Sequence, residues 1–314
     1  MNISFRQLRL FLALAEQGSV SAAARALHVT QPTASMQLRE IQEAAGLPLY
    51  TLVGRRVQLT EAGEALAATA RRMLDDWIDW EQQLAAWKGL ASGRLRVAVV
   101  STAKYFVPRL LGSFCAQYPD IDIRLEVLNR DGVVQRLREQ RDDLAIMSMP
   151  PADLALDDAV FLPNPLVLIA PGDHPLAQAE ALTLDDLAGE RFILRERGSG
   201  TRMAADAHFR AAGFRPQLRL ELGSNEAIKE AVAGGLGLSV LSAHTLHGRA
   251  REHGVQVLPV AGFPLTGHWH VVHRQGRALS PVARVFREHL LGQAGRVAAE
   301  VAAGGHFSKP ALQP

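Results

Sequence analysis

The chain has 314 residues, of which 48% are hydrophobic, and its formal net charge is +2. This length and apolar content suffice for two or three folded domains, which excludes a disordered chain and a small disulfide-stapled scaffold, and the near-neutral charge excludes a histone-like electrostatic binder. With Cys115 as the single cysteine, no membrane-length apolar run and no secretory signal pattern, we expect a cytoplasmic protein without membrane contact.

The first sixty residues predict three short helices. Apolar residues recur at helical spacing before Gly18, and Gly18 followed by Ser19 is typical of the end of one helix and the N-cap of the next. The second helix, residues 20–27, is rich in alanine, so another helix can cross it closely. Thr30 is suited to cap a third helix, in which Pro32 is tolerated because the first-turn N–H groups have no intrahelical partner.

The third predicted helix has two different faces. Ala34, Leu38 and Ile41 share an apolar face, which we expect to pack on the alanine-rich helix. The opposite face carries hydroxyl, amide and guanidinium groups that match base edges and phosphates, so the pattern predicts a helix-turn-helix that binds double-stranded DNA. An ordinary helical hairpin with a solvated polar face is the alternative. The expected DNA-contacting residues here are Thr30, Gln31, Pro32, Thr33, Ser35, Met36 and Arg39.

A β-hairpin is predicted over residues 47–63. Gly54, Arg55 and Arg56 separate two apolar segments, so the tip of this hairpin carries two basic side chains. We expect Arg55 and Arg56 to reach the DNA backbone or the minor groove, as the wing of a winged helix-turn-helix.

A long helix with a regular apolar seam is predicted after the hairpin. Its apolar residues lie alternately four and three positions apart, which is the a/d pattern of a coiled coil. We expect a second copy of the chain to cover this seam, in parallel or antiparallel orientation. Packing on the chain's own domains is the alternative, because the pattern spans only three heptads. The seam consists of Leu66, Ala70, Met73, Trp77, Trp80, Leu84 and Trp87.

From Arg94 onward, strands alternate with helices, which predicts an α/β fold with a parallel sheet. Apolar strand-like segments alternate with helical segments over residues 95–148 and again over 165–242. The strand-like segment 268–274 and a helix over 280–291 are expected to return to the first set. Two α/β lobes joined by crossing strands form a cleft, and such clefts bind small molecules.

Two strand-to-helix junctions in these lobes carry groups suited to an anion. One precedes a helix expected over 104–118, and the other opens a helix expected over 201–212. Helix N-termini present free N–H groups and the positive end of the helix dipole, to which hydroxyl and basic side chains add. Simple helix capping by the two serines is the alternative. The expected ligands of a small anionic metabolite, with Asn225 from a third helix start, are Ser101, Thr102, Lys104, Ser199, Gly200, Thr201, Arg202 and Asn225.

An enzyme and an exported solute-binding protein are the rival interpretations. Seven histidines between His208 and His273 invite a metal or acid–base site, but none has a cysteine or carboxylate at ligand spacing, so we expect no metal. There is also no Walker-type loop, no G-x-S-x-G elbow and no nucleophile beside a base, so we expect no catalytic residues. A solute-binding protein would share the cleft but would not need the first ninety residues.

The amino-terminal pattern resembles the winged helix-turn-helix signature of LysR-type transcriptional regulators. Two positions depart from it, because the family usually has arginine at Leu52 and glutamate at Gln42, and we expect one wing contact to phosphate to be missing. The residues that carry the resemblance are Ser19, Ala22, Ala23, Leu27, Thr30, Gln31, Pro32, Ser35, Gln37, Leu38, Gly46, Leu49, Tyr50, Arg55, Leu59, Thr60, Ala62 and Gly63.

The resemblance implies a transcriptional regulator with four parts. These are a winged helix-turn-helix over residues 1–60, a linker helix for dimerisation over 61–92, a two-lobed effector domain like periplasmic binding proteins over 93–295, and a flexible tail over 296–314. It also implies a homodimer or homotetramer that reads an interrupted palindrome and acts with RNA polymerase.

The effector domain resembles, more narrowly, that of regulators of Calvin-cycle (RuBisCO) operons. The stretches that carry this resemblance include "VSTAKYFVPRLL" and "DLAIMSMPP". It implies phosphorylated sugars or a reduced nicotinamide phosphate as effectors, and no bound cofactor. Ser148, which we include among the expected effector residues, and Met149 stand where that subgroup often has Gly-Arg, which weakens the case for the same ligand.

Overall fold

The computed structural model describes residues 3–53, 56–87, 93–246 and 249–303, without the side chains of 79, 82, 83, 85–87 and 300–303. The chain divides into two compact units, Met1–Leu90 and Ala91–Pro314. None of the helices within these described ranges is long and apolar enough to cross a membrane.

The amino-terminal unit consists of helices and a two-stranded hairpin. Ser4 begins the first helix with a capping box that it shares with Gln7, and Gly18 ends that helix in the left-handed conformation, with φ of 66°. Ser19 and Thr30 accept hydrogen bonds from first-turn N–H groups of the next two helices, which confirms the predicted caps. The elements are α1 (Phe5–Gln17), α2 (Val20–Ala26), α3 (Gln31–Ala45), β1 (Tyr50–Val53), β2 (Arg56–Leu59) and α4 (Glu61–Trp87).

The core of this unit lies between α1, α2 and α3. Ala34, Leu38 and Ile41 on α3 are fully buried against apolar side chains of α1 and α2, as their helical spacing predicts. The strands β1 and β2 pair antiparallel as the predicted hairpin. The Val57 N–H donates to the Gly18 carbonyl at 2.8 Å, so the hairpin is attached to the end of α1.

The predicted seam on α4 divides into two parts. Leu66 and Ala70 pack with α1 of the same chain, so the alternative of packing on the chain's own domain holds for the first part. Further along, Met73, Trp77 and Trp80 are 47%, 42% and 45% exposed. Large apolar side chains at this exposure form an unpartnered face on the second half of the helix.

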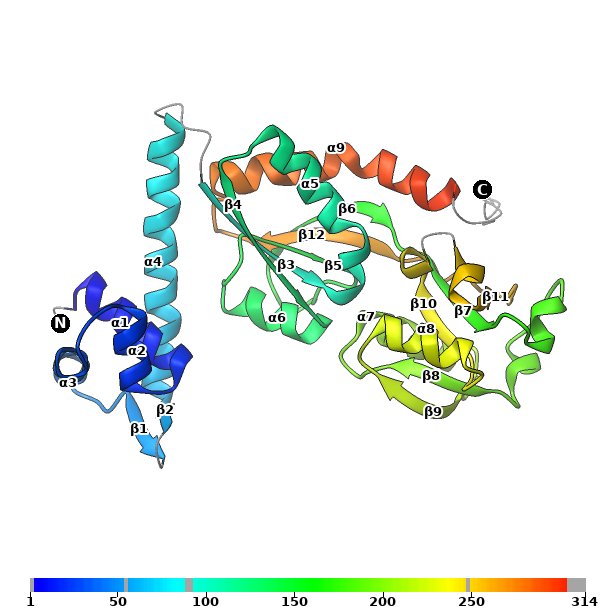
Figure 1. Cartoon of the computed structure of the whole chain (residues 1–314), viewed down its shortest axis with the longest axis horizontal. Helices are drawn as coiled ribbons and strands as arrows, with labels where there is room; N and C mark the ends of the chain where they lie inside the picture. The colour runs from blue at the N-terminus through cyan, green and yellow to red at the C-terminus, as the bar shows by residue number, and fades with distance from the viewer. Residues whose placement is uncertain (1–2, 54–55, 88–92, 247–248, 304–314) are drawn as a thin grey trace. The chain divides into compact units, whose positions relative to one another are not determined.

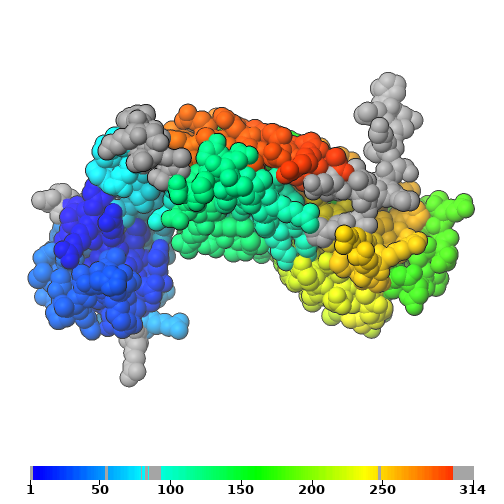
Figure 2. Space-filling view, turned by 45° about the horizontal axis from the view of Figure 1, so that its top comes forward, coloured from blue at the N-terminus to red at the C-terminus, as the bar shows by residue number. Residues whose placement is uncertain are grey.

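The first lobe of the carboxy-terminal unit is built on a five-stranded sheet with the order β4-β3-β5-β12-β6 (Figure 1). Its elements are β3 (Gly93–Val100), the short 3-10 helix η1 (Ser101–Tyr105), α5 (Val107–Gln117), β4 (Ile121–Leu128), α6 (Arg130–Arg138), β5 (Leu144–Met147), β6 (Leu156–Pro163), β12 (His268–Arg274) and α9 (Pro281–Ala303). β3 pairs parallel with β4 and β5, and β12 pairs antiparallel with β5 and β6, which confirms the predicted return of the late strand. α5 and α9 cover one face and α6 the other, and Figure 2 shows α9 along the surface of this lobe.

The second lobe places one helix on each face of a sheet. Along β7, Leu166 and Leu168 belong to the core that includes α7, whereas Val167 and Ile169 belong to the core that includes α8. This alternation is expected of a strand that is buried on both faces. The elements are β7 (Leu166–Pro171), η2 (Pro175–Gln178), η3 (Asp185–Leu187), β8 (Arg191–Arg195), α7 (Gly200–Ala211), β9 (Gln217–Leu222), α8 (Asn225–Ala233), β10 (Ser239–Ser242), η4 (Ala243–Leu246), η5 (Ala250–His253) and β11 (Val255–Val257).

Two chain segments cross between the lobes, one before β7 and one before β12, and they form a hydrogen-bonded ribbon. The Asn164 N–H donates to the Gly267 carbonyl at 2.8 Å, and Leu166 and Leu265 exchange two backbone hydrogen bonds at 3.0 and 2.8 Å. A Cβ at Gly267 would lie 2.8 Å from the Asn164 carbonyl oxygen, so no side chain fits at that point of the crossing.

Some elements differ from the sequence prediction. The helix expected over 104–118 is divided, because residues up to Tyr105 form η1 and α5 begins at Val107 with Pro108 in its first turn, where proline is tolerated. α9 continues to Ala303, past the expected end at 291 and into the predicted tail, because Val297 is buried in the core of the first lobe. β6 was not expected, since charged residues occupy its exposed first half.

Candidate functional site

The exposed face of α3 presents the side chains that the sequence predicts to contact DNA. Pro32, Ser35, Met36 and Arg39 are exposed, while the opposite face of the helix is buried in the core. Met36, at 54% exposure, is a large apolar side chain in the middle of this face. A face of this kind on the second helix of a helix-turn-helix is suited to a DNA major groove.

Three other predicted DNA-contacting residues also shape the turn before α3. The Thr30 hydroxyl accepts a hydrogen bond from the Thr33 N–H and lies 2.8 Å from the Thr33 hydroxyl. Gln31 Oε1 accepts a hydrogen bond from the Ser21 hydroxyl of α2 at 3.0 Å. These bonds connect the start of α3 to its N-cap residue and to α2.

The wing is connected to α3 through a glutamine. Gln42 Oε1 accepts a hydrogen bond from the Leu49 N–H at 3.0 Å, so this amide holds the entry of the hairpin where the resemblance leads one to expect glutamate. Arg56 is exposed at the start of β2. Arg55 lies outside the described residues.

An aromatic cluster occupies the exposed half of α4. The Trp77 and Trp80 rings lie 5.0 Å apart between centroids, and Trp77 also lies 5.5 Å from the Phe5 ring. Leu84 is half-buried, and the side chain of Trp87 lies outside the described part of the chain. The unpartnered apolar face therefore centres on Met73, Trp77 and Trp80.

A cavity of about 230 Å³ lies where the two lobes meet the crossing ribbon. Of the predicted effector residues, it brings together Ser148, Gly200 and Thr201. Thr201 is 7% exposed, and its hydroxyl forms no hydrogen bond within the described part of the chain. The residues that line the cavity are Ser148, Met149, Asn164, Leu166, Gly200, Thr201, Ala204, Leu265, Thr266, Gly267, His268 and His270.

Ser199 precedes α7 without capping it. It occupies the N-cap position of α7 and is buried, yet its side chain makes no capping hydrogen bond. Simple capping therefore does not account for Ser199. The first N–H groups of α7 lie beside a cavity that contains the Thr201 hydroxyl, which is a favourable environment for an anion.

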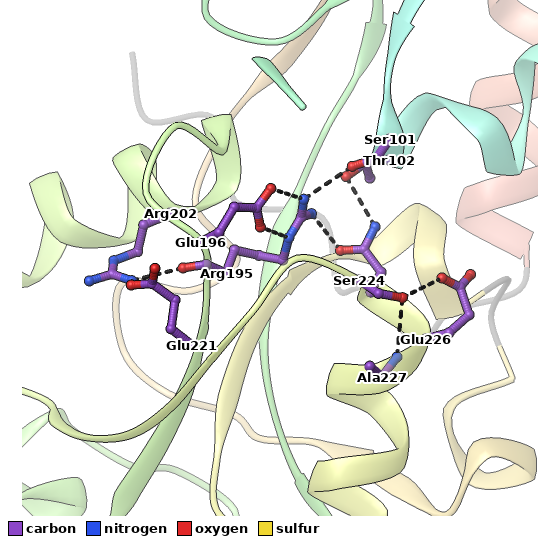
Figure 3. Close-up of polar contacts among 10 residues, drawn as sticks. Ser101, Thr102, Arg195, Glu196, Arg202, Glu221, Ser224, Glu226 and Ala227 are labelled. Carbon is purple, nitrogen blue, oxygen red and sulfur yellow. Dashed lines mark hydrogen bonds and ion pairs between the residues drawn. The ribbon is translucent and has the colours of Figure 1, made fainter. Parts of the chain in front are cut away.

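A second group of predicted residues forms a network between the lobes (Figure 3). Arg195 at the end of β8 is 2% exposed; its Nη1 donates to Asn225 Oδ1 at 2.6 Å and its Nη2 to the Ser101 hydroxyl at 3.1 Å. Asn225 Nδ2 donates to the Thr102 hydroxyl at 3.2 Å. Both oxygens of Glu196 accept from the same guanidinium, at 2.8 and 2.9 Å. Ser101, Thr102 and Asn225 thus join the lobes through a buried arginine and do not line the cavity.

An ion pair between the lobes lies beside this network. Lys104 Nζ is 2.8 Å from Glu226 Oε2, and the Tyr105 hydroxyl donates to the same carboxylate. Burial raises the pKa of Glu226, but the hydrogen bonds from Lys104 and Tyr105 outweigh it and lower that pKa to about 2. Burial and the hydrogen bond to Glu226 raise the pKa of Tyr105. Lys104 therefore holds the lobes together instead of facing the cavity.

The side chain of Arg202 neither lines the cavity nor joins the two lobes. Its guanidinium lies 2.9 Å from Asp206 one turn along α7 and 3.0 Å from Glu221 on β9, and it donates to the Arg195 carbonyl at 2.7 Å. These contacts lie within the second lobe, as Figure 3 shows for Glu221. Arg202 is therefore not one of the cavity residues.

The lobes also approach each other at a glycine. Gly198 has φ of 88°, and a Cβ at this position would overlap the Asp131 carboxylate at the start of α6. Glycine is therefore required by both the backbone conformation and the close approach.

Sequence reasoning missed Arg195, His268 and His270. Arg195 closes an apolar strand and precedes Glu196, and a cation at the end of a buried strand could have indicated a paired, buried arginine. The two histidines were interpreted as structural or surface residues, because their placement beside the cavity depends on how β12 crosses between the lobes.

Two family models match the chain. The LysR substrate binding domain matches residues 88–295, and the bacterial regulatory helix-turn-helix protein, lysR family, matches residues 5–64. The matches correspond to the two compact units described above.

Similar whole proteins are transcriptional regulators. A RuBisCO operon transcriptional regulator of Allochromatium vinosum is 42% identical over 297 residues, which cover 95% of this chain and 98% of that protein. The HTH-type transcriptional activator CmpR of Synechocystis is 42% identical over 289 residues, covering 92% and 95%. Among solved structures, the Synechocystis PCC6803 CcmR regulatory domain in complex with 2-PG is 45% identical with a TM-score of 0.63, covering 65% of this chain and 98% of that one.

Proposed function

The chain belongs to the LysR family of bacterial DNA-binding transcriptional regulators, and from this premise we propose that a small phosphorylated metabolite in the inter-lobe cavity controls it. The relatives are regulators and not enzymes, so the enzyme interpretation and the solute-binding interpretation are set aside.

The observation that carries the effector proposal is the environment of Thr201. Thr201 is 7% exposed at the start of α7 and lines the cavity, and its hydroxyl, which has no hydrogen-bond partner within the described residues, is available to a ligand. The free N–H groups of a helix N-terminus favour a phosphate. Ser148 adds a second hydroxyl from the first lobe.

The cavity has room for a small phosphorylated compound. A phosphate ester with two or three carbons fits this space. 2-Phosphoglycolate (2-PG), which the CcmR regulatory domain binds, is a compound of the fitting size.

The DNA-binding proposal rests on the exposed face of α3 and on the wing. Pro32, Ser35, Met36 and Arg39 are placed to contact base edges in the major groove, and Arg56 to contact phosphate. Two such units on a dimer would read an interrupted palindrome. The exposed tryptophans of α4 support dimerisation, on which a tetramer would be built.

The regulated genes are inferred from the relatives. Because a RuBisCO operon regulator is 42% identical over nearly the whole chain, we place this protein in the cytoplasm as a regulator of carbon-fixation genes that acts with RNA polymerase. Chromatin immunoprecipitation of the full-length protein is the test. Binding sites upstream of carbon-fixation genes are expected, and sites confined to unrelated genes would contradict the assignment.

The effector proposal is tested by thermal unfolding of the full-length protein. A ligand at 100 times its dissociation constant adds about 2.7 kcal/mol, which is roughly 5 to 10 °C for a domain of this size. We expect 2-PG to raise the midpoint and glycolate, which lacks the phosphate, to leave it unchanged. Thr201→Ala should reduce the shift, and the matched control Thr201→Ser should preserve it. A panel of small phosphate esters without any shift would refute the phosphate site.

A further inference from the structure

We propose that His270 recognises the phosphate of the effector by taking up a proton when the effector binds. This inference rests on the proposed function and goes further, because it assigns the positive charge in the site to one side chain. It makes effector affinity depend on pH.

The first argument is the composition of the cavity wall. Among the residues that line it, His268 and His270 are the side chains that can carry a charge; the others are hydroxyl, amide, apolar or glycine. A phosphate monoester carries nearly two negative charges at neutral pH, and burying it without a cation is unfavourable. A protonated histidine in the wall is therefore the local source of compensating charge.

The second argument is the pairing of His270 with Asp158. His270 Nδ1 lies 2.7 Å from Asp158 Oδ1 on the adjacent strand β6, and the imidazole is 18% exposed. The carboxylate accepts the Nδ1–H, so Nε2 is the ring nitrogen left for a ligand. Asp158 also stabilises the protonated ring, in the way that a carboxylate partner orients and charges a histidine in other sites.

The protonation state decides whether His270 attracts the phosphate. In the neutral ring, Nε2 carries a lone pair, which repels a phosphate oxygen. In the protonated ring, Nε2–H donates a charge-assisted hydrogen bond. A bound phosphate therefore favours the protonated ring, and the complex holds one more proton than the free protein and ligand.

The other charged groups around His270 have separable effects. Asp158 faces it from β6 and His268 lies two residues away on β12. Arg130 at the start of α6 donates from Nε to the carbonyl of the cavity residue Met149 at 2.8 Å, and its Nη1 lies 3.7 Å from Asp131. These groups act on a bound phosphate through their charge, and the variants described below separate their effects from that of His270.

His273 provides a matched control. It lies on the same strand and pairs with Asp157 on β6, with Nε2 and Oδ2 3.2 Å apart, but it does not line the cavity. Burial lowers the pKa of His273. His273→Gln therefore removes the same chemical group from the same pair of strands without touching the site.

The test is isothermal titration calorimetry of 2-PG with the full-length protein between pH 7 and 8.5, in two buffers of different ionisation enthalpy. The phosphate of 2-PG, whose second pKa is about 6, is about 90% doubly ionised at pH 7 and about 99% at pH 8, so the free ligand supplies almost no proton, and the variants show whether an added proton belongs to His270. We expect uptake of up to one proton and a dissociation constant that rises up to about tenfold per pH unit. His270→Gln and Asp158→Asn should flatten this dependence, and His273→Gln should retain it.

The outcomes separate this inference from the proposed function. If wild-type protein binds 2-PG without proton uptake, or if His270→Gln retains the full pH dependence, the role of His270 is refuted while the phosphate site stands. If His268→Gln loses the pH dependence and His270→Gln retains it, the role of His270 is also refuted, and His268 is the residue that takes up the proton. If 2-PG and other small phosphate esters do not bind the wild-type protein at all, both proposals fail.

Discussion

Replacing Asn225 by alanine should weaken the contact between the two lobes. The Asn225 side chain is 1% exposed, accepts a hydrogen bond from Arg195 at 2.6 Å and donates one to Thr102 at 3.2 Å. Alanine removes both partners and leaves a guanidinium N–H and a hydroxyl buried without them. The Arg195 side chain remains bound to Glu196 and Ser101, so the charge itself keeps its counter-ion.

The expected loss of stability follows from these two bonds. A buried group left without its partner costs about 1–3 kcal/mol, so we expect about 2–6 kcal/mol for the two groups together. A domain of 150–250 residues loses about 2–4 °C in midpoint for each kcal/mol, which gives a decrease of roughly 4 to 24 °C.

Differential scanning calorimetry of the full-length protein is the assay. Unfolding enthalpy scales with domain size, so the transition with the larger enthalpy reports the carboxy-terminal unit. Asn225→Asp is the matched control, because its carboxylate can accept from both Arg195 and the Thr102 hydroxyl, and it should lower the midpoint less. A decrease below about 2 °C for alanine, or equal decreases for both variants, would refute the proposed importance of this network.

Three further predictions concern other parts of the molecule. Arg39→Ala should weaken operator binding in a fluorescence-anisotropy titration and reduce the salt slope by about one, whereas Arg124→Ala on β4 should change neither; equal effects would refute the base- or phosphate-contacting role. Trp77→Glu should lower the mass measured by light scattering toward that of a monomer, while Met36→Glu on the DNA-facing helix should not. For Glu226, whose pKa is lowered to about 2 in the folded protein, the stabilisation is present above the unfolded-state pKa of about 4.5 and is lost as the pH falls toward 2. The difference in midpoint between wild type and Glu226→Gln should therefore be largest above pH 5 and shrink below it, and a constant difference would contradict the ion pair.

Features that depend on local sequence signals could be predicted. Ser19 and Thr30 are followed by helices that they cap, and Leu38 lies on the buried face that its spacing indicates. Such signals act over one or two turns of a helix. The order of the helices in the amino-terminal unit and most strands of the two lobes followed from them.

Features that depend on distant partners could not be predicted. Arg195 contacts Ser101, 94 residues away, across the two lobes, and His270 pairs with Asp158, 112 residues away, on the neighbouring strand of the first lobe, so the surroundings of both depend on distant parts of the chain. For Arg202, in contrast, a local signal in the sequence was overlooked. Its partner Asp206 lies one helical turn along α7, and this i, i+4 pairing was available in the sequence as a reason to expect an intrahelical ion pair.

The cavity lies beside the two segments that join the lobes, so a ligand bound there can affect how the lobes are oriented. Asn164, Thr266 and Gly267 belong to the segments that join the lobes and also line the cavity, so a ligand there sits next to the pivot. A small rotation at a pivot produces a much larger displacement at the far ends of both lobes. Short-range contacts with a few atoms of a metabolite can thus produce a larger displacement at the outer surfaces of both lobes. A small effector suffices for such a change, because it binds close to the segments about which the lobes rotate.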